Sequence, residues 1–456
     1  MDRGENELLT RPIPALVRKL AVPASVGFFF NTMYNVVDTY WGGKLSTEAL
    51  AALSLSFPVF FIIIAAGSGL STGLTALIAN ALGGGRREDA SRLSAQGASF
   101  SVLVSIVLSI VGIFAAPKLF MLLGADGSYL GLSLSYMNVI FLGTVFFLLS
   151  YALNSTLNAT GDTKTFRNFL IAGFFLNLIL DPMFMFGWLG LPALGLKGVA
   201  LATVVIELLG CVYLGWRVSK LSLSRGRRVN DFIPNLTVFR EIAGQSIPAS
   251  LNMVTVGLGI FIITYFIAPF GQTVVAAYGI ATRVEQIFLL PTIGLTVAAL
   301  TLVGQSNGAG NVARARESVV VCLKYGIYIM TVGTIAIFFF AKPFMGIFTN
   351  DVDVISSGAF YLRIAAFLTW AYAVMFTNVS ALQGMKKPLF AVWIGLGRQI
   401  IGPVLIFWLF STWFGLSGIW WGIFLINWTA AIITMVYARR VFRQAELAER
   451  VHEAHN

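Results

Sequence analysis

The sequence predicts an all-α integral membrane protein with twelve transmembrane helices. Of its 456 residues, 57% are hydrophobic and only 11% are charged, and the mean hydropathy is +0.82. A helical span needs about 20 apolar residues to cross about 30 Å of hydrocarbon, and the apolar runs here are continuous. This composition excludes a soluble enzyme, a nucleic-acid-binding module and a disordered chain. Continuous runs also exclude an outer-membrane barrel, whose strands alternate apolar and polar residues.

Short polar loops separate the expected helices. The approximate spans are 15–42, 48–82, 93–123, 130–160, 166–189, 197–219, 239–268, 276–308, 315–347, 357–384, 389–413 and 417–443. The longest polar break, at 220–236, divides the chain nearly in half. We therefore expect two six-helix lobes, at 1–222 and 237–456, joined by a cytoplasmic linker at 223–236.

The distribution of lysine and arginine predicts the orientation. With a cytoplasmic N-terminus, the cytoplasmic segments hold 24 of the 31 basic residues and the opposite side holds 5. The other two, Arg283 and Arg398, lie in apolar spans. Because positively charged loops remain inside, we expect a multi-pass protein of the inner (plasma) membrane with both termini in the cytoplasm. The net charge of +11 is thus explained without a nucleic-acid partner.

An internal repeat relates the two halves. LAVPAS at 20–25 matches QSIPAS at 245–250, and Gly69-Leu70-Ser71 matches Gly294-Leu295-Thr296, both at an offset of 225 residues. Each half has an even number of spans, so the two copies share one orientation. We expect a pseudo-twofold axis along the membrane normal, as in parallel-repeat transporters. The alternative is a duplicated scaffold that frames no substrate path.

A polar stripe runs along the first span. Asn31, Tyr34, Asn35 and Asp38 follow at spacings of three and four residues, which places them on one helix face. Lipid cannot satisfy such a stripe, so it must face the protein interior or water. Charges inside spans are costly and are functional candidates by default. The alternative is a hydrogen-bonded seam between helices.

A second acid lies in the fifth span, in the segment NLILDP. Asn177 and Asp181 are four residues apart and share a helix face. Pro182 lacks an N–H group and frees the backbone carbonyl of Leu178. Oxygens of this kind suit a hard cation, whereas dry surroundings or a second carboxylate favour a proton. The site therefore fits either Na⁺ or H⁺, and the alternative is a proline kink with a capping aspartate.

The second half lacks both acids. In the repeat, Asp38 falls opposite Ile263, Asn177 opposite Arg398, and Asp181 opposite Gly402. Ion coupling is thus expected in the first half.

The other charged residues within spans are Glu207, Arg283, Glu285 and Arg398. Arg283 and Glu285 lie two residues apart and cannot face each other on a helix, so we expect them to pair with other spans or to line the cytoplasmic end. We expect Arg398 to satisfy backbone carbonyls or polar groups. The role of Glu207 stays open between structure and a proton route. Gly83-Gly84-Gly85 lacks the Gly-Lys-Ser/Thr ending of a P-loop, and there is no His/Cys cluster for a transition metal. We therefore expect no cofactor beyond the coupling ion.

Four segments resemble the multidrug and toxic compound extrusion (MATE) family. They are PASVGFFFNTMYNVVDTYWGG in the first span, GLSTGLTALIANALGGGRREDA closing the second, LNATGDTKTFRN after the fourth and NLILDP in the fifth. The resemblance implies a V-shaped pair of lobes with a central cleft and alternating access. Acids of the NorM-like branch are absent from the seventh and tenth spans, so the chain resembles the DinF-like branch.

The resemblance also implies roles for individual residues. In DinF-like members, the acids matching Asp38 and Asp181 carry ion coupling, and the polar residues matching Asn177 and Thr203 lie beside them. The implied lining of the substrate cavity is Asn31, Tyr34, Tyr136 and Asn154.

These observations favour a monomeric, cation-coupled antiporter that exports amphipathic, often cationic compounds. H⁺ is slightly favoured over Na⁺, which would use Asp38, Asp181, Asn177 and Thr203. Pro23 frees the carbonyl of Lys19 and is expected to let the first span bend when Asp38 is protonated. The alternative is a lipid-linked precursor flippase of the same superfamily. The resemblance implies more basic cavities for flippases, and the lobe-restricted acid pair argues against a channel or scaffold.

Overall fold

The computed structural model describes residues 6–455, and side chains for residues 6–451. These residues form helices only, as the sequence predicts. The helices of the first part of the chain are α1 (Glu7–Thr10), α2 (Ile13–Leu45), α3 (Thr47–Gly83), α4 (Arg87–Leu122), α5 (Gly127–Ala159), α6 (Lys164–Phe186), η1 (Trp188–Gly190), α7 (Leu196–Ser219), η2 (Ser222–Ser224) and η3 (Val229–Phe232). The remaining helices are α8 (Leu236–Ile267), η4 (Ala268–Phe270), α9 (Gln272–Gly308), α10 (Val312–Gly346), α11 (Val352–Ala366), α12 (Leu368–Gly384), α13 (Leu389–Leu396), η5 (Gly397–Ile401) and α14 (Gly402–His455).

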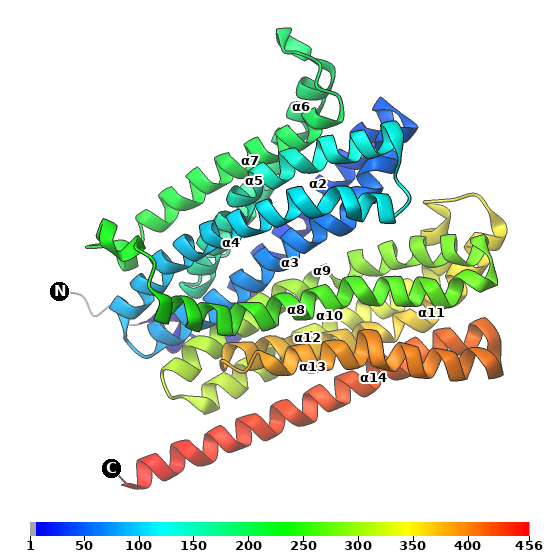
Figure 1. Cartoon of the computed structure of the whole chain (residues 1–456). Helices are drawn as coiled ribbons and strands as arrows, with labels where there is room; N and C mark the ends of the chain where they lie inside the picture. Colours follow the sequence, from blue (N-terminus) through cyan, green and yellow to red (C-terminus); the bar gives the residue numbers. More distant parts are fainter. Residues whose placement is uncertain (1–5, 456) are drawn as a thin grey trace. The chain divides into compact units, whose positions relative to one another are not determined.

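Twelve crossing segments are confirmed once two bent helices are taken into account. By length and composition, ten helices within the described residues can span a membrane, and α11 with α12 forms an eleventh span bent by 48°. The tenth helix, Leu389–Val451, is 63 residues long and contains a non-helical residue, Gly415, with φ 59° and ψ −140°. Figure 1 shows the chain reversing direction between the orange and the red arms of α14, so this helix makes two crossings.

The chain divides into two compact units, Val26–Ser250 and Met1–Ser25 with Leu251–Asn456. The division falls inside α2 and α8, whereas the sequence analysis placed it at the polar linker 223–236. The linker belongs to the first of these units because it is bonded to α4. Gln96 donates to the carbonyls of Asp231 and Ile233 at 2.6 and 2.7 Å, and the Asn235 N–H donates to Gln96 at 2.9 Å.

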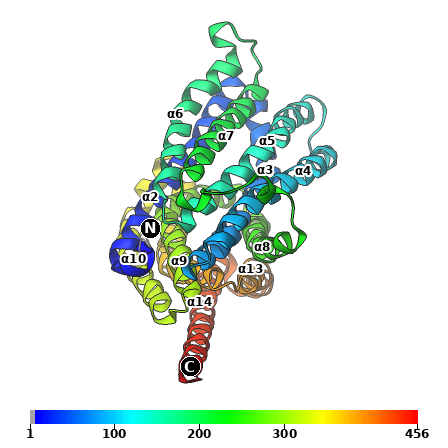
Figure 2. The same ribbon diagram turned by 90° about the vertical axis from the view of Figure 1, so that its left-hand side faces the viewer.

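In the unit Val26–Ser250, α5 packs against α3, α4 and α7, and α6 packs against α7. Figures 1 and 2 show these helices running side by side. Small residues permit the close approach, since a Cβ on Gly143 would overlap Val204 and a Cβ on Gly210 would overlap Phe169. Such glycine contacts are typical of helix packing in membranes, where van der Waals contact replaces the hydrophobic effect.

Asp162, in the segment LNATGDTKTFRN, holds the turn between α5 and α6. Its carboxylate accepts hydrogen bonds from the N–H and hydroxyl of Thr165 and pairs with Arg217 at 3.3 Å. Burial alone would raise the pKa of Asp162, but the Thr165 hydrogen bonds and the Arg217 guanidinium outweigh it and lower that pKa below its ordinary value. This stabilisation is present at neutral pH and is lost as the pH falls through the lowered folded-state pKa.

The repeated motifs explain why the unit boundary lies inside α2 and α8. The Pro-Ala-Ser segment at 23–25 packs on Gly294 of α9, where an added Cβ would overlap the Ser25 hydroxyl and the Ala21 carbonyl. In the other unit, the same segment at 248–250 packs on Gly69 of α3, where an added Cβ would overlap the backbone of Ser250. Each copy of the motif thus packs on the glycine of the other copy of the repeat.

We predict that Gly294→Ala destabilises the protein by about 1–3 kcal/mol, because the new methyl group meets backbone atoms that cannot move aside. The measurement is thermal unfolding in detergent. Gly279→Ala is the matched control on the same helix, since no atom lies within 4 Å of its added Cβ. Equal melting temperatures for the two variants would contradict this packing.

Candidate functional site

One amide group joins two carboxyl groups from different helices. Asn177 Nδ2 on α6 donates to Asp38 Oδ1 of α2 at 2.9 Å and to Asp181 Oδ1 at 2.9 Å. Asn177 and Asp181 are 0% exposed, and Asp38 is half-buried. The four-residue spacing of Asn177 and Asp181 places them on one face of α6, and this face meets the polar stripe of α2 at Asp38.

The two carboxyl groups accept from the same amide nitrogen, so they lie close to each other. Ionised carboxylates offer only acceptors, so a hydrogen bond between the two would need a proton on one of them. Without a proton or another cation, the two like charges repel in a medium of low dielectric. The geometry is therefore suited to a group that takes up and releases one positive charge.

Three buried oxygens of this group have no hydrogen-bond partner among the described residues. They are Tyr34 Oη, Asn177 Oδ1 and Asp181 Oδ2. A buried polar group without a partner costs about 1–3 kcal/mol, so each of these atoms needs water or an ion to satisfy it. Oxygens of hydroxyl, amide and carboxyl groups are the ligands that hard cations take.

The other expected site residues differ in burial and in their contacts with the carboxyl pair. Tyr34 is one turn before Asp38 on α2, and its hydroxyl lies near Thr203 and interacts electrostatically with both carboxyl groups. Tyr136 of α5 also interacts electrostatically with Asp38 and Asp181. It is buried in a hydrophobic cluster to which several helices of the unit contribute. Thr203 of α7 is buried and donates to the carbonyl of Val199 on its own helix.

Two of the expected cavity residues stand apart from the carboxyl pair. Asn31 is exposed at the surface of its unit, and Asn154 of α5 is buried with no bond to either carboxyl group. Neither predicted kink residue ends its helix, because α2 continues through Pro23 and α6 continues through Pro182. The helix α6 ends instead at Gly187, which adopts φ 75°.

The structure gives Glu207 a partner that the sequence did not indicate. Ser150 Oγ on α5 donates to Glu207 Oε2 on α7 at 2.8 Å. The charge of Glu207 also acts on Tyr34. Glu207 therefore lies in the same unit and the same electrostatic environment as the carboxyl pair, held by a separate hydrogen bond.

The remaining charged residues of the spans, Arg283, Glu285 and Arg398, belong to the other unit. Arg283 is exposed, whereas Glu285 is buried and accepts a hydrogen bond from the Tyr361 hydroxyl at 3.1 Å. Arg398 is buried in the π-helical turn η5 and donates to Asn427 Oδ1 at 2.9 Å. Glu285 is therefore bonded to a residue of another helix, α11. Arg398 has the polar partner that was expected of it, a side-chain amide.

Comparison with known proteins identifies the family. A family model described as MatE matches residues 23–183 and again residues 248–408. The second match begins and ends 225 residues after the first, which is the offset of the repeated motifs. The family's unit thus occurs twice in this chain.

Whole-chain similarities agree with this match. The FAD transporter of Shewanella oneidensis is 27% identical over 399 residues, which cover 88% of each protein. The multidrug export protein MepA of Staphylococcus aureus is 27% identical over 433 residues, which cover 93% of each. One solved structure matches with a TM-score of 0.91 at 24% identity, covering 98% of this chain and 99% of that one. It is described as the outward-facing conformation of a multidrug resistance MATE family transporter of the MOP superfamily.

With twelve crossing segments and two matches to the family model, the protein belongs to the MATE family of membrane transporters and is not an enzyme.

Proposed function

We propose that the protein is a monomeric cation-coupled antiporter that exports amphipathic, often cationic compounds by alternating access. The observation that carries this proposal is the buried Asn177 amide, which bonds Asp38 and Asp181 at 2.9 Å each. The two carboxyl groups alternate between a state that holds a cation and a state that does not. Because the two states differ in charge, they favour different arrangements of α2 against α6.

We further propose that H⁺ is the coupling ion. A proton requires one carboxyl group to hold it and one acceptor beside it, and the two aspartates supply both. Na⁺ would need more oxygens, for which the unpartnered atoms of Asn177 and Asp181 and the hydroxyl of Thr203 are candidates. We place the chain in the DinF-like branch because Asp38 and Asp181 lie in one unit and the repeat offers Ile263 and Gly402 in their place. We also propose an inner-membrane location with both termini in the cytoplasm.

A second candidate substrate is a flavin dinucleotide. It is favoured by the similarity to the FAD transporter, which matches the chain over a length comparable to that of the multidrug relatives. Export of FAD from loaded proteoliposomes tests it directly. The lipid-linked flippase alternative predicts, instead, translocation of a lipid-anchored substrate and no export of soluble dyes.

We predict that Asp38→Asn abolishes coupled export while the protein stays folded. Asparagine retains an oxygen for Asn177 but cannot ionise. Each coupled proton supplies about 2.3 kcal/mol per 100 mV of membrane potential, so its loss lowers the sustained substrate gradient roughly fiftyfold. The measurement is the accumulation ratio in proteoliposomes under an imposed potential. Asp126→Asn, an exposed loop aspartate of the same unit, is the control. Accumulation at the wild-type level would make Asp38 a structural residue.

We predict that efflux continues at fixed pH when all Na⁺ is replaced by N-methyl-D-glucamine, because H⁺ is the coupling ion. Efflux should then stop when a protonophore dissipates the pH gradient. If efflux instead stops and millimolar Na⁺ restores it, Na⁺ is the coupling ion and the carboxyl pair holds a metal ion.

We predict that α2 bends near Pro23 when Asp38 is protonated. Pro23 cannot bond the carbonyl of Lys19, so bending costs less there than elsewhere in the helix. Pro23 also lies two residues before the point at which α2 passes from one compact unit to the other. Structures determined at acidic and at neutral pH measure this bend. An α2 of identical shape in both, with Asp38 protonated in one, is the contrary result.

A further inference from the structure

The unit formed by Met1–Ser25 and Leu251–Asn456 contains a buried charge cluster that the ion-coupling pair does not explain. Its centre is Arg398, which is 9% exposed and lies in η5, a π-helical turn. Turns of this kind insert an extra residue into a helix and occur frequently at functional sites. In the repeat, Arg398 occupies the position of Asn177, so the second half places a cation where the first half places an amide.

Arg398 has fewer hydrogen-bond acceptors than it has donors. The guanidinium carries five N–H donors, and within the described part of the chain one hydrogen bond reaches an acceptor, Asn427 Oδ1 at 2.9 Å. Its Cζ atom lies over the rings of Tyr372 and Phe376, at 5.8 and 5.9 Å from their centroids. A buried guanidinium with free donors is suited to a bidentate bond with a planar anion such as a carboxylate.

The two aromatic partners of the guanidinium stack on each other. Tyr372 and Phe376 are one turn apart on α12, and their rings stack at 5.6 Å with an angle of 15° between them. Both side chains are only half-buried, so part of each remains exposed at the surface of the unit.

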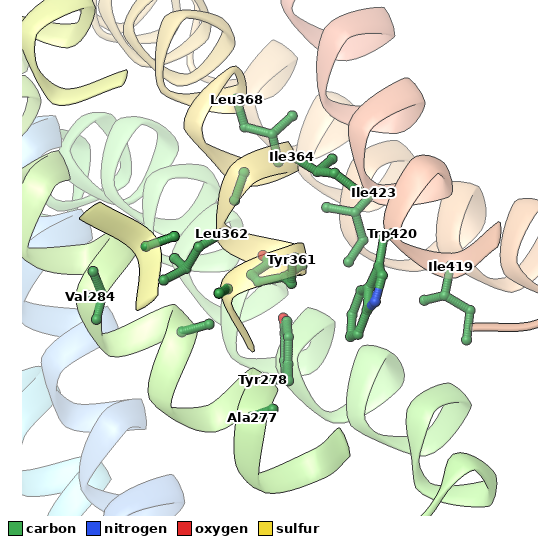
Figure 3. Close-up of a cluster of buried hydrophobic side chains, with 14 of the residues drawn as sticks. Ala277, Tyr278, Val284, Tyr361, Leu362, Ile364, Leu368, Ile419, Trp420 and Ile423 are labelled. Atoms are coloured by element: carbon green, nitrogen blue, oxygen red, sulfur yellow. The ribbon is translucent and has the colours of Figure 1, made fainter. Parts of the chain in front are cut away.

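An anionic group lies in the same cluster without neutralising Arg398. Glu285 is 6% exposed, its Oε2 accepts from Tyr361, and its Oε1 has no partner in the described residues. Glu285 and Arg398 interact electrostatically, yet their described side chains form no salt bridge. Figure 3 shows Tyr361 beside Tyr278 and Trp420, whose ring centroids lie 5.4 and 4.8 Å from that of Tyr361. This packing fixes the tyrosine that orients Glu285.

We propose that this cluster is a binding subsite for zwitterionic aromatic compounds. Arg398 binds the carboxylate, Glu285 attracts the cationic group, and the stacked rings of Tyr372 and Phe376 receive the planar body. A cation and an anion that are buried near each other and unpaired are costly unless a ligand satisfies both. A zwitterion satisfies both at once, whereas a simple cation leaves the Arg398 donors unfilled. The inference rests on the proposed export function and names a substrate class for it.

The test compares two dyes that share one cationic ring system. Rhodamine 110 carries a free carboxylate, and rhodamine 123 is its methyl ester. The readout is the ratio of their dissociation constants for the purified protein, measured by fluorescence anisotropy, together with export of both dyes from proteoliposomes. We expect Arg398→Met to shift the ratio against rhodamine 110 by about tenfold or more, because the variant loses a charge-assisted hydrogen bond to the carboxylate. Arg283→Met, the other arginine in a span, is the matched control and should leave the ratio as in the wild type.

A second variant keeps the test decisive if Arg398→Met fails to fold. Arg398→Lys retains the charge but loses the planar fork, so its ratio should fall between the wild type and the methionine variant. Glu285→Gln should weaken both dyes alike, since both carry the cationic ring system. A ratio that Arg398→Met and Arg398→Lys leave unchanged overturns the subsite while export stands. Absence of export and binding of both dyes in the wild-type protein overturns the proposed function, and the subsite with it.

Discussion

The absence of solvent inside a bilayer governs this structure, because each buried polar group must find its partner within the protein. Many of the buried hydroxyls meet this condition within their own helix, as Thr203 does with the Val199 carbonyl. The carboxyl groups of Asp38 and Asp181 cannot do so, and one amide, that of Asn177, serves both. Two oxygens of this cluster, Asn177 Oδ1 and Asp181 Oδ2, have no hydrogen-bond partner among the described residues. They are therefore available to bind a proton or a metal ion.

The repeat gives the two units related scaffolds with different chemistry at corresponding positions. Asn177 in one half corresponds to Arg398 in the other, and Asp181 corresponds to Gly402. The first site holds two acids from α2 and α6 around an amide. The second surrounds a guanidinium with an amide, two aromatic rings and a separate acid on α9. The two halves therefore carry different chemistry at corresponding sequence positions, a neutral amide against a cation and a carboxyl group against a glycine.

Local sequence patterns predicted the helices and part of the site. Apolar runs gave the twelve crossings, and the four-residue spacing placed Asn177 and Asp181 on one face. That this face meets Asp38 came from the family resemblance, because spacing within one helix carries no information about its neighbour. The exchanged segments of α2 and α8 and the η5 turn were not predicted. They depend on contacts between distant helices, such as Arg398 with Asn427, 29 residues apart.

The exchange of helix segments has a consequence for the order of folding during synthesis. Leu16, Val17 and Leu20 are buried in a cluster whose other members include Leu295, Ala298 and Leu302 of α9. These early residues leave the ribosome long before their partners exist, and domains otherwise fold as units from the N-terminus. The start of α2 must therefore wait in the membrane, without its packing partners, until α9 has been inserted. A fragment cut at the polar linker would hold the whole of α2 yet lack the surface on which its first four turns pack.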